Sequence, residues 1–246
     1  SRDGFRAFHV DRYRNPGMRV LVACEESGRV RDAFIRRGHD AMSCDLLETS
    51  SPGPHYCGDV HDIIGNGWDM MIAFPPCTHI AVSGAAWFAA KRADGRQQQG
   101  VDFFMSLANA PIPRIAIENP VGIMSKSWRK PDQIIQPYYF GDEFQKTTCL
   151  WLKGLPPLTH SASSDLFQER THVGRGEFVT FASGKRMAKW YAELRASDKR
   201  GHIRSKTFPG IAEAMAAQWG SLALGIVAEI PQAERRGIEA DSPVPS

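Results

Sequence analysis

Short apolar runs alternate with longer, polar-faced segments between Arg19 and Gln136. This alternation is typical of βαβ units around a parallel sheet, and no other feature of the chain constrains the fold as strongly. Helices are expected after Gly28, as far as about Arg37, and from Gly100 to Ala110. Five runs have the length of strands, and they cover residues 19–24, 40–45, 55–57, 70–74 and 114–117. The sequence therefore predicts an α/β fold with a Rossmann-like sheet.

The residues that directly follow these strands are the candidates for chemistry, because ligands of open parallel sheets bind outside the carboxyl ends of the strands. Pro75, Pro76 and Cys77 follow the fourth run. Two prolines fix the backbone and hold the next side chain rigidly at the rim of the sheet, which is the placement that a nucleophile needs. A buried, inert cysteine is the alternative. The proline pair favours Cys77 as a nucleophile.

A carboxylate stands at the end of the fifth run, in the sequence Glu118-Asn119-Pro120. Carboxylates at the rim of an apolar sheet commonly have a raised pKa, which suits them to proton donation. Glu118 could instead cap a following helix. With Cys77 on the neighbouring strand end, however, Glu118 completes a pair of nucleophile and acid.

In this order, the residues resemble the DNA cytosine-5 methyltransferases, in a compact form associated with bacteriophages. The nucleophile motif of that family, Pro-Cys, is matched by Pro76-Cys77, and its Glu-Asn-Val motif is matched by Glu118-Asn119 with Pro120 in place of Val. Gln145 matches the first residue of a Gln-x-Arg-x-Arg segment whose arginines are replaced here. The resemblance covers about residues 18–155.

This resemblance implies an S-adenosylmethionine-dependent methyltransferase sheet with a small basic target-recognition insert. It implies that Cys77 adds to C6 of a cytosine flipped out of double-stranded DNA, and that C5 is then methylated. Glu118 would act at N3 of the base. Asn119 would orient the nucleophile loop, and Gln145 would contact a phosphate or fill the space that the base leaves.

The resemblance also implies a set of cofactor contacts. The glycine-rich first loop of the family is replaced here by residues 24–28, which keep one glycine, and Glu25 or Glu26 would contact the amino group of the cofactor. Asp45 would bind the ribose hydroxyls and Asp59 the adenine amino group, although an aspartate after a glycine also forms turns. The expected cofactor-binding residues are Cys24, Glu25, Ser27, Gly28, Asp45, Asp59, Val60 and Pro75.

The formal net charge of +3 is unevenly distributed along the chain. Residues 168–206 hold ten Lys and Arg against four acidic residues, so this segment carries +6 and the remaining chain −3. A merely solvated face is the alternative, but the cluster favours contact with nucleic-acid phosphates. About 40 residues are few for reading base edges, so a recognition site as short as a dinucleotide is expected. The expected DNA contacts are Arg170, Arg175, Lys185, Arg186 and Lys189.

The predicted organisation has five parts. Residues 1–17 form an N-terminal arm and 18–158 the catalytic domain. A basic target-recognition segment follows at 159–203, beginning with a polar hinge at Thr159–Ser164. Residues 204–230 return to the catalytic domain, with a helix over Pro209–Leu224, and 231–246 are a disordered tail.

Cysteine content and hydropathy exclude several classes of protein. The five cysteines are odd in number and show no C-x-x-C spacing, which argues against a disulfide framework and a structural zinc site. No apolar run approaches the ~20 residues of a membrane span, and no signal peptide is evident. We expect a cytoplasmic monomer, in a bacterium or a phage-infected cell, without a metal ion. Three alternatives stay open: an enzyme of this fold that acts on RNA or a nucleotide, one that transfers another group to C5, and a catalytically dead DNA-binding module.

Overall fold

The structure, a computed structural model, describes residues 17–163, 169–184, 186–193 and 207–224. The expected N-terminal arm and C-terminal tail therefore lie almost entirely outside the described residues. Within the described ranges, no helix has both the length and the apolar character to cross a membrane.

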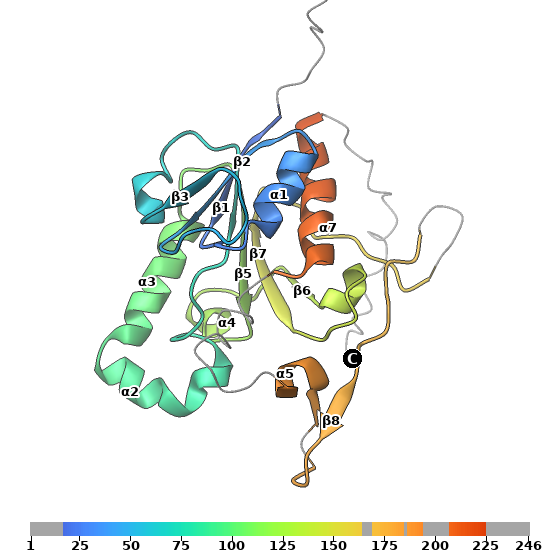
Figure 1. Ribbon diagram of the computed structural model, residues 1–246. Coiled ribbons are helices and arrows are strands. Elements are labelled where there is room, and N and C mark those ends of the chain that lie inside the picture. Colours follow the sequence, from blue (N-terminus) through green and yellow to red (C-terminus); the bar gives the residue numbers. More distant parts are fainter. Residues whose placement is uncertain (1–16, 164–168, 185, 194–206, 225–246) are drawn as a thin grey trace, which may run out of the picture.

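A seven-stranded mixed sheet forms the centre of the fold, with the strand order β3-β2-β1-β4-β5-β7-β6 (Figure 1). Strands β1 to β5 are parallel, and β7 runs antiparallel to both of its neighbours, β5 and β6. Chain order reverses at β1, which lies between β2 and β4, so the carboxyl ends of these strands flank the crevice where a ligand is expected. The strands are β1 (Arg19–Ala23), β2 (Asp40–Asp45), β3 (His55–Cys57), β4 (Met70–Ala73), β5 (Arg114–Pro120), β6 (Gln133–Ile135) and β7 (Thr148–Lys153).

Both faces of the sheet are buried, because successive residues of each central strand enter different cores. In β1, Val20 and Val22 belong to one hydrophobic cluster, while Leu21 and Ala23 belong to the other. A parallel sheet covered on both faces needs such continuously apolar strands. The alternation of apolar runs in the sequence therefore correctly predicted the α/β class.

Helices cover the two faces as three layers (Figure 1). Helices α1 (Arg29–Arg36) and α7 (Pro209–Gly220) pack together on one face, where Phe34 and Trp219 are fully buried. Helix α3 (Arg96–Ala108) covers the other face through Phe104 and Leu107. The remaining helical elements are α2 (Phe88–Ala93), α4 (Met124–Ser127), α5 (Lys189–Glu193) and the 3-10 helices η1 (Val60–Asp62), η2 (Val82–Trp87), η3 (Pro137–Phe140) and η4 (Ser221–Leu224).

The expected elements differ from the observed ones mainly at their ends. Strand β5 continues to Pro120, because β7 pairs with it there in antiparallel register after its parallel neighbour β4 has ended at Ala73. Helix α3 begins earlier than expected, at Arg96, where Asp94 accepts a hydrogen bond from the Arg96 backbone N–H (3.1 Å). The predicted C-terminal helix ends at Gly220 and continues as the 3-10 turn η4.

The expected target-recognition segment contains a small hairpin, made of β8 (Phe178–Thr180) and β9 (Arg186–Ala188), followed by α5. At the start of this segment, the predicted hinge residue Thr159 is tied to α7. Its backbone N–H donates to Gln218 (2.7 Å), and the Gln218 amide donates back to the Thr159 carbonyl (2.9 Å). Thr159 is therefore anchored to α7.

Candidate active site

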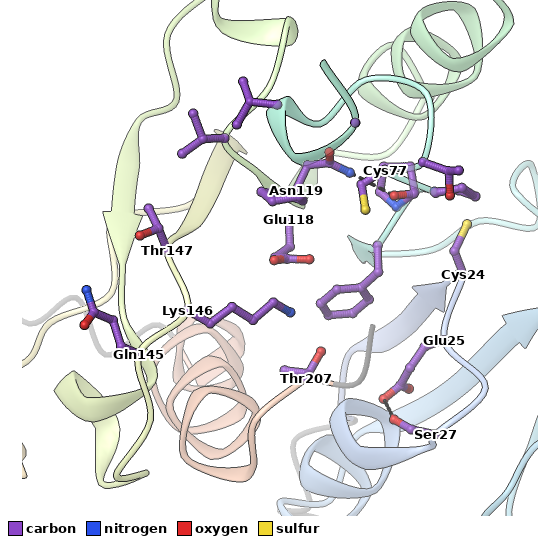
Figure 2. Close-up of a pocket in the computed structure, with 18 of the residues that line it drawn as sticks. Cys24, Glu25, Ser27, Cys77, Glu118, Asn119, Gln145, Lys146, Thr147 and Thr207 are labelled. Carbon is purple, nitrogen blue, oxygen red and sulfur yellow. Dashed lines mark hydrogen bonds between the residues drawn. The ribbon is translucent and has the colours of Figure 1, made fainter. Parts of the chain in front are cut away.

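A cavity of about 1080 Å³ opens at the carboxyl ends of β1, β2, β4 and β5 (Figure 2). Residues from the loops after these strands line one side of it, and the hairpin β8–β9 with α5 lines another. The cavity brings together most of the residues singled out in the sequence, namely Cys24, Glu25, Ser27, Asp45, Pro75, Cys77, Glu118, Asn119, Gln145 and Arg186.

Cys77 is half-buried in this cavity, at the start of a tight turn. Its backbone carbonyl accepts hydrogen bonds from the N–H groups of Ile80 (3.1 Å) and Ala81 (2.9 Å). Asn119 donates its side-chain amide to the Pro75 carbonyl (2.8 Å), two residues before the cysteine. This contact joins the end of β5 to the loop that carries Cys77.

Lys91 reaches the same loop from α2, and the sequence analysis did not identify it. Its buried ammonium lines the cavity and donates to the Thr78 carbonyl (2.5 Å). Gly84 lies against this contact, since a Cβ there would stand 3.2 Å from Lys91 Nζ. Nothing in the sequence marks Lys91, because a lysine on a short helix is usually solvated.

Glu118 extends from β5 into the cavity, opposite the end of the Lys146 side chain (Figure 2). Its Oε1 atom is buried and has no hydrogen-bond partner within the described chain. Burial raises the pKa of Glu118, although the positive charge of Lys146 and a hydrogen bond with Thr148 oppose this shift. A buried carboxyl group with a raised pKa and an open oxygen can donate a proton to a ligand.

Gln145, Lys146 and Thr147 line the cavity from the loop before β7. Thr147 accepts a hydrogen bond from the Gln136 amide (2.9 Å), which fixes this loop to the end of β6. Gln145 was expected at the site from the sequence, whereas Lys146 was not. Its only mark in the sequence is that it directly follows Gln145.

The loop after β1 forms the opposite end of the cavity. Cys24 has a φ of 59°, a left-handed conformation that glycine adopts readily and other residues rarely do. Glu25 Oε1 accepts hydrogen bonds from the Val30 backbone N–H (2.9 Å) and the Ser27 hydroxyl (3.0 Å), while Oε2 is buried without a hydrogen-bond partner among the described residues. Burial raises the pKa of Glu25, and these two hydrogen bonds oppose the shift. The open oxygen can accept a hydrogen bond from a ligand amino group.

Gly28, expected among the cofactor-binding residues, does not line the cavity. It caps α1 with a φ of 70°, and a Cβ at this position would stand 2.3 Å from the Arg31 guanidinium. The fold itself therefore accounts for this glycine.

A second, smaller cavity of about 140 Å³ adjoins the first and shares Cys24, Asp45 and Pro76 with it. Asp59, expected at the adenine amino group, and Val60, expected among the cofactor-binding residues, line this second cavity together with Phe103. Its lining is mostly apolar with two carboxylates, which suits a flat heterocycle that carries a sugar.

The two carboxylates of the second cavity are also used by the fold. Asp45 Oδ1 accepts from the Leu47 backbone N–H (3.0 Å). Asp59 Oδ1 accepts from the backbone N–H of His61 (2.9 Å), and these contacts with His61 lower the pKa of Asp59. Asp59 therefore forms a turn, which was the alternative to its contact with a ligand. It uses only one of its two carboxylate oxygens for this turn. No group of three or more potential metal ligands occurs within the described residues.

Only part of the basic segment is described, and Lys185 lies outside it, as do five further cations. The described part of the segment contains four cationic and three acidic residues, so it carries a net charge of +1, whereas the whole segment carries +6. Lys189 forms an ion pair with Glu177 (2.6 Å). Arg175 lies over the Tyr138 ring and Arg186 over the Phe178 ring, at 5.4 and 4.9 Å from the ring centres. Arg170 donates to the His172 carbonyl (3.0 Å).

The chain matches no protein-family model and no curated protein. Among solved structures, it is similar to a protein encoded within an Escherichia coli prophage and provisionally named a DNA modification methyltransferase. The two share 17% sequence identity with a TM-score of 0.40, over 55% of this chain and 46% of the other. The chain thus matches less than half the length of that protein.

Proposed function

We propose that the chain is an S-adenosylmethionine-dependent DNA cytosine-5 methyltransferase with a short recognition sequence. The observation that carries this proposal is that Cys77, Glu118 and Asn119, which belong to two different strand ends, line one cavity. A nucleophile and a carboxyl group with a raised pKa, held on adjacent parallel strands, match the needs of addition to a pyrimidine ring.

In the proposed reaction, the Cys77 thiolate adds to C6 of cytosine, and the electron pair of the C5–C6 double bond moves toward C5. Glu118 donates its proton at N3, which disperses the charge that would otherwise build up on the ring. C5 takes up a methyl group, which S-adenosylmethionine supplies when bound. Loss of the C5 proton to solvent restores the double bond and expels the Cys77 thiolate, while the N3 proton returns to Glu118.

The residues around the two cavities fit this cofactor. The open Oε2 of Glu25 suits the amino group of its methionine part, with Ser27 and Cys24 beside it. Asp45, shared by both cavities, suits the ribose hydroxyls. Asp59 and Val60 suit the adenine ring in the smaller cavity, and the second oxygen of Asp59 suits its amino group.

DNA is the proposed macromolecular substrate. The target base must leave the helix to reach Cys77, at a cost of a few kcal/mol, and phosphate contacts of Arg170, Arg175, Lys185, Arg186 and Lys189 would offset it. We propose that residues 159–203 form the target-recognition segment and that 204–230 return the chain to the catalytic domain at 18–158. Sequencing the methylation pattern on random-sequence duplex DNA tests the short site, and a site of six defined bases would contradict it.

A second candidate is an enzyme of the same chemistry that acts on RNA or a free nucleotide. The observation that favours it is the small net charge of the described part of the basic segment, in which Lys189 is already paired. Incubation with labelled S-adenosylmethionine and, separately, duplex DNA, RNA or dCMP distinguishes the candidates. We expect label at cytosine C5 of duplex DNA alone, and none with Cys77→Ala. Label in RNA or dCMP only would contradict the choice of DNA, and no label in any substrate would contradict methyl transfer.

A further inference from the structure

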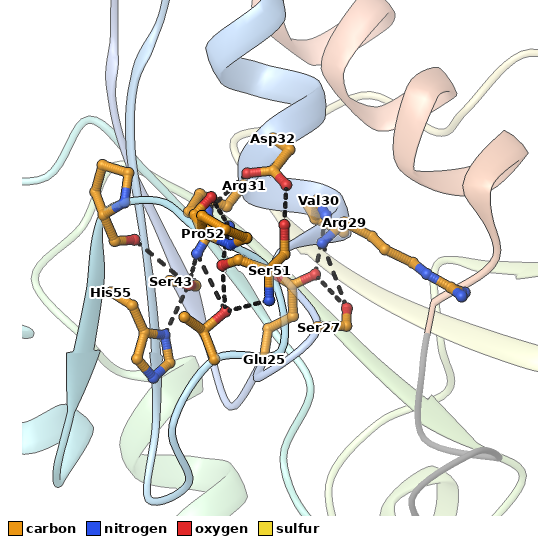
Figure 3. A network of polar contacts seen from close by, with 12 residues as sticks. Glu25, Ser27, Arg29, Val30, Arg31, Asp32, Ser43, Ser51, Pro52 and His55 are labelled. Atoms are coloured by element: carbon orange, nitrogen blue, oxygen red, sulfur yellow. Dashed lines mark hydrogen bonds and ion pairs between the residues drawn. The ribbon is translucent and has the colours of Figure 1, made fainter.

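Arg31 is fully buried, although it lies on α1 at the edge of the catalytic body (Figure 3). Each of its guanidinium donors has an acceptor. Nε donates to Asp32 (2.8 Å), one terminal nitrogen to the hydroxyls of Ser43 (3.1 Å) and Thr49 (3.3 Å), and the other to the carbonyls of Ser51 (2.9 Å) and Pro52 (3.2 Å). Five donors thus meet five contacts, which uses the whole capacity of an arginine. A lysine cannot reproduce this pattern.

These contacts join two loops that line the main cavity. The Thr49 hydroxyl, which accepts from Arg31, donates to the Glu26 carbonyl (2.9 Å), and the Ser50 backbone N–H donates to the same carbonyl (2.9 Å). Glu26 belongs to the loop after β1, whereas Thr49 and Ser50 belong to the loop after β2. Arg31 therefore connects the loop that holds Glu25 and Ser27 with the loop that begins at Asp45.

Two glycines make room for the guanidinium. A Cβ at Gly28 would stand 2.3 Å from Arg31, and one at Gly53 would stand 2.7 Å from it, both far inside van der Waals contact. Both glycines also have positive φ, 70° and 153°. The two loops are thus built around this side chain. The sequence analysis counted the missing glycines of the first loop as a departure from the resembled family, and Arg31 offers a different means of fixing that loop.

We propose that Arg31 is a positioning residue for the cofactor site: through Thr49 it holds the loop after β1 and the loop after β2 in the mutual arrangement that a nucleoside-containing ligand requires. The inference rests on the proposed function for the identity of the ligand, S-adenosylmethionine.

The test compares three variants. Arg31→Lys keeps the charge and loses the fork of donors. Thr49→Val removes one hydroxyl, keeps nearly the same side-chain volume and leaves Arg31 in place. This variant therefore remains informative if Arg31→Lys fails to fold. Arg36→Lys is the matched control, because Arg36 lies on the same helix and is exposed, where it pairs with Glu213. Binding of S-adenosylhomocysteine is measured by calorimetry, binding of duplex DNA by mobility shift, and backbone exchange of residues 24–28 and 46–53 by hydrogen–deuterium mass spectrometry.

We expect Arg31→Lys and Thr49→Val to weaken S-adenosylhomocysteine binding by about tenfold or more, the usual result of breaking a buried hydrogen bond. Both variants should speed backbone hydrogen exchange in the two loops together, while their affinity for DNA stays unchanged. The Arg36→Lys control should match wild type in all three measurements. Unchanged nucleoside affinity in a folded Thr49→Val, or faster exchange in one loop only, would overturn the inference. If wild-type protein bound no S-adenosylhomocysteine, the proposed function would fail, whereas the exchange data would still decide whether Arg31 couples the loops.

Discussion

Cys24 shows how a residue other than glycine can hold a backbone conformation that glycine favours. The residue lies directly after β1 with a φ of 59°, and its side chain lines both cavities. Burial raises the pKa of its thiol, which favours the neutral thiol and makes Cys24 a poor candidate for a nucleophile. The conformation is one that glycine adopts without strain, while a β-branched residue there is strongly disfavoured.

We therefore predict opposite results for two substitutions at this position. Cys24→Gly should keep the melting temperature and the affinity for S-adenosylhomocysteine close to wild type, because relief of backbone strain offsets the lost contacts of the thiol. Cys24→Val should destabilise the fold by about 1–3 kcal/mol, the usual range for a residue held in a disfavoured conformation. Thermal unfolding measures both. Equal stability of the two variants would mean that the backbone at this position is not held in the left-handed region.

Glu118 gives a prediction for pH dependence. Its pKa is raised in the fold relative to the unfolded chain, mainly by burial, so the folded state holds the proton more tightly. The stability that this protonation contributes is complete at acid pH and is lost as the pH rises through the raised pKa.

Glu118→Gln should remove this dependence, since the amide stays neutral. The variant should unfold at a higher temperature than wild type at pH 8, and the difference should shrink as the pH falls toward 4. Calorimetric melts across this range provide the measurement. Glu177→Gln serves as a control, because Glu177 is exposed and its pKa is lowered by Lys189. A difference between Glu118→Gln and wild type that grew toward acid pH would refute the assignment.

At the scale of elements, the strands could be predicted more reliably than their ends. Strands β2 and β3 have the bounds read from the sequence. Strand β5 does not end at Ile117, since its last three residues pair with β7, an element 28 residues further along the chain. Strand β6 and the hairpin β8–β9 were also missed, because each of these strands has only three residues, too few to show a readable alternation.

The hairpin β8–β9 and the segment before it carry the prediction for DNA binding. Charge reversal at Arg175 and Arg186 should weaken duplex binding by about tenfold or more, and each lost phosphate contact should reduce the slope of log affinity against log salt by about one. Binding of S-adenosylmethionine should stay largely intact. Arg36→Glu is the control, because Arg36 lies on α1, away from the hairpin (Figure 1). Equal losses in the control and in the double variant would show that the effect is not local.

In the whole molecule, the sequence predicts which strand-end residues line one cavity. It does not predict the side-chain contacts that fix the surrounding loops. Cys77 and Glu118 lie 41 positions apart, yet parallel strands bring their carboxyl ends to one edge of a sheet, so their shared cavity follows from the strand pattern alone. The contacts of Lys91, Lys146 and Arg31 depend on side-chain directions and loop paths. No periodicity in the sequence encodes those.

Covalent trapping shows whether Cys77 is the nucleophile of the proposed cytosine-5 methyltransferase. Duplex DNA that contains 5-fluorocytosine is incubated with the protein and S-adenosylmethionine. Fluorine replaces the C5 hydrogen, so the proton loss that would release the thiolate cannot occur. We predict a denaturation-resistant adduct, with DNA attached to the peptide that holds Cys77 and with no adduct in Cys77→Ala. The absence of an adduct with the intact protein, or an adduct that persists in Cys77→Ala, would contradict the account.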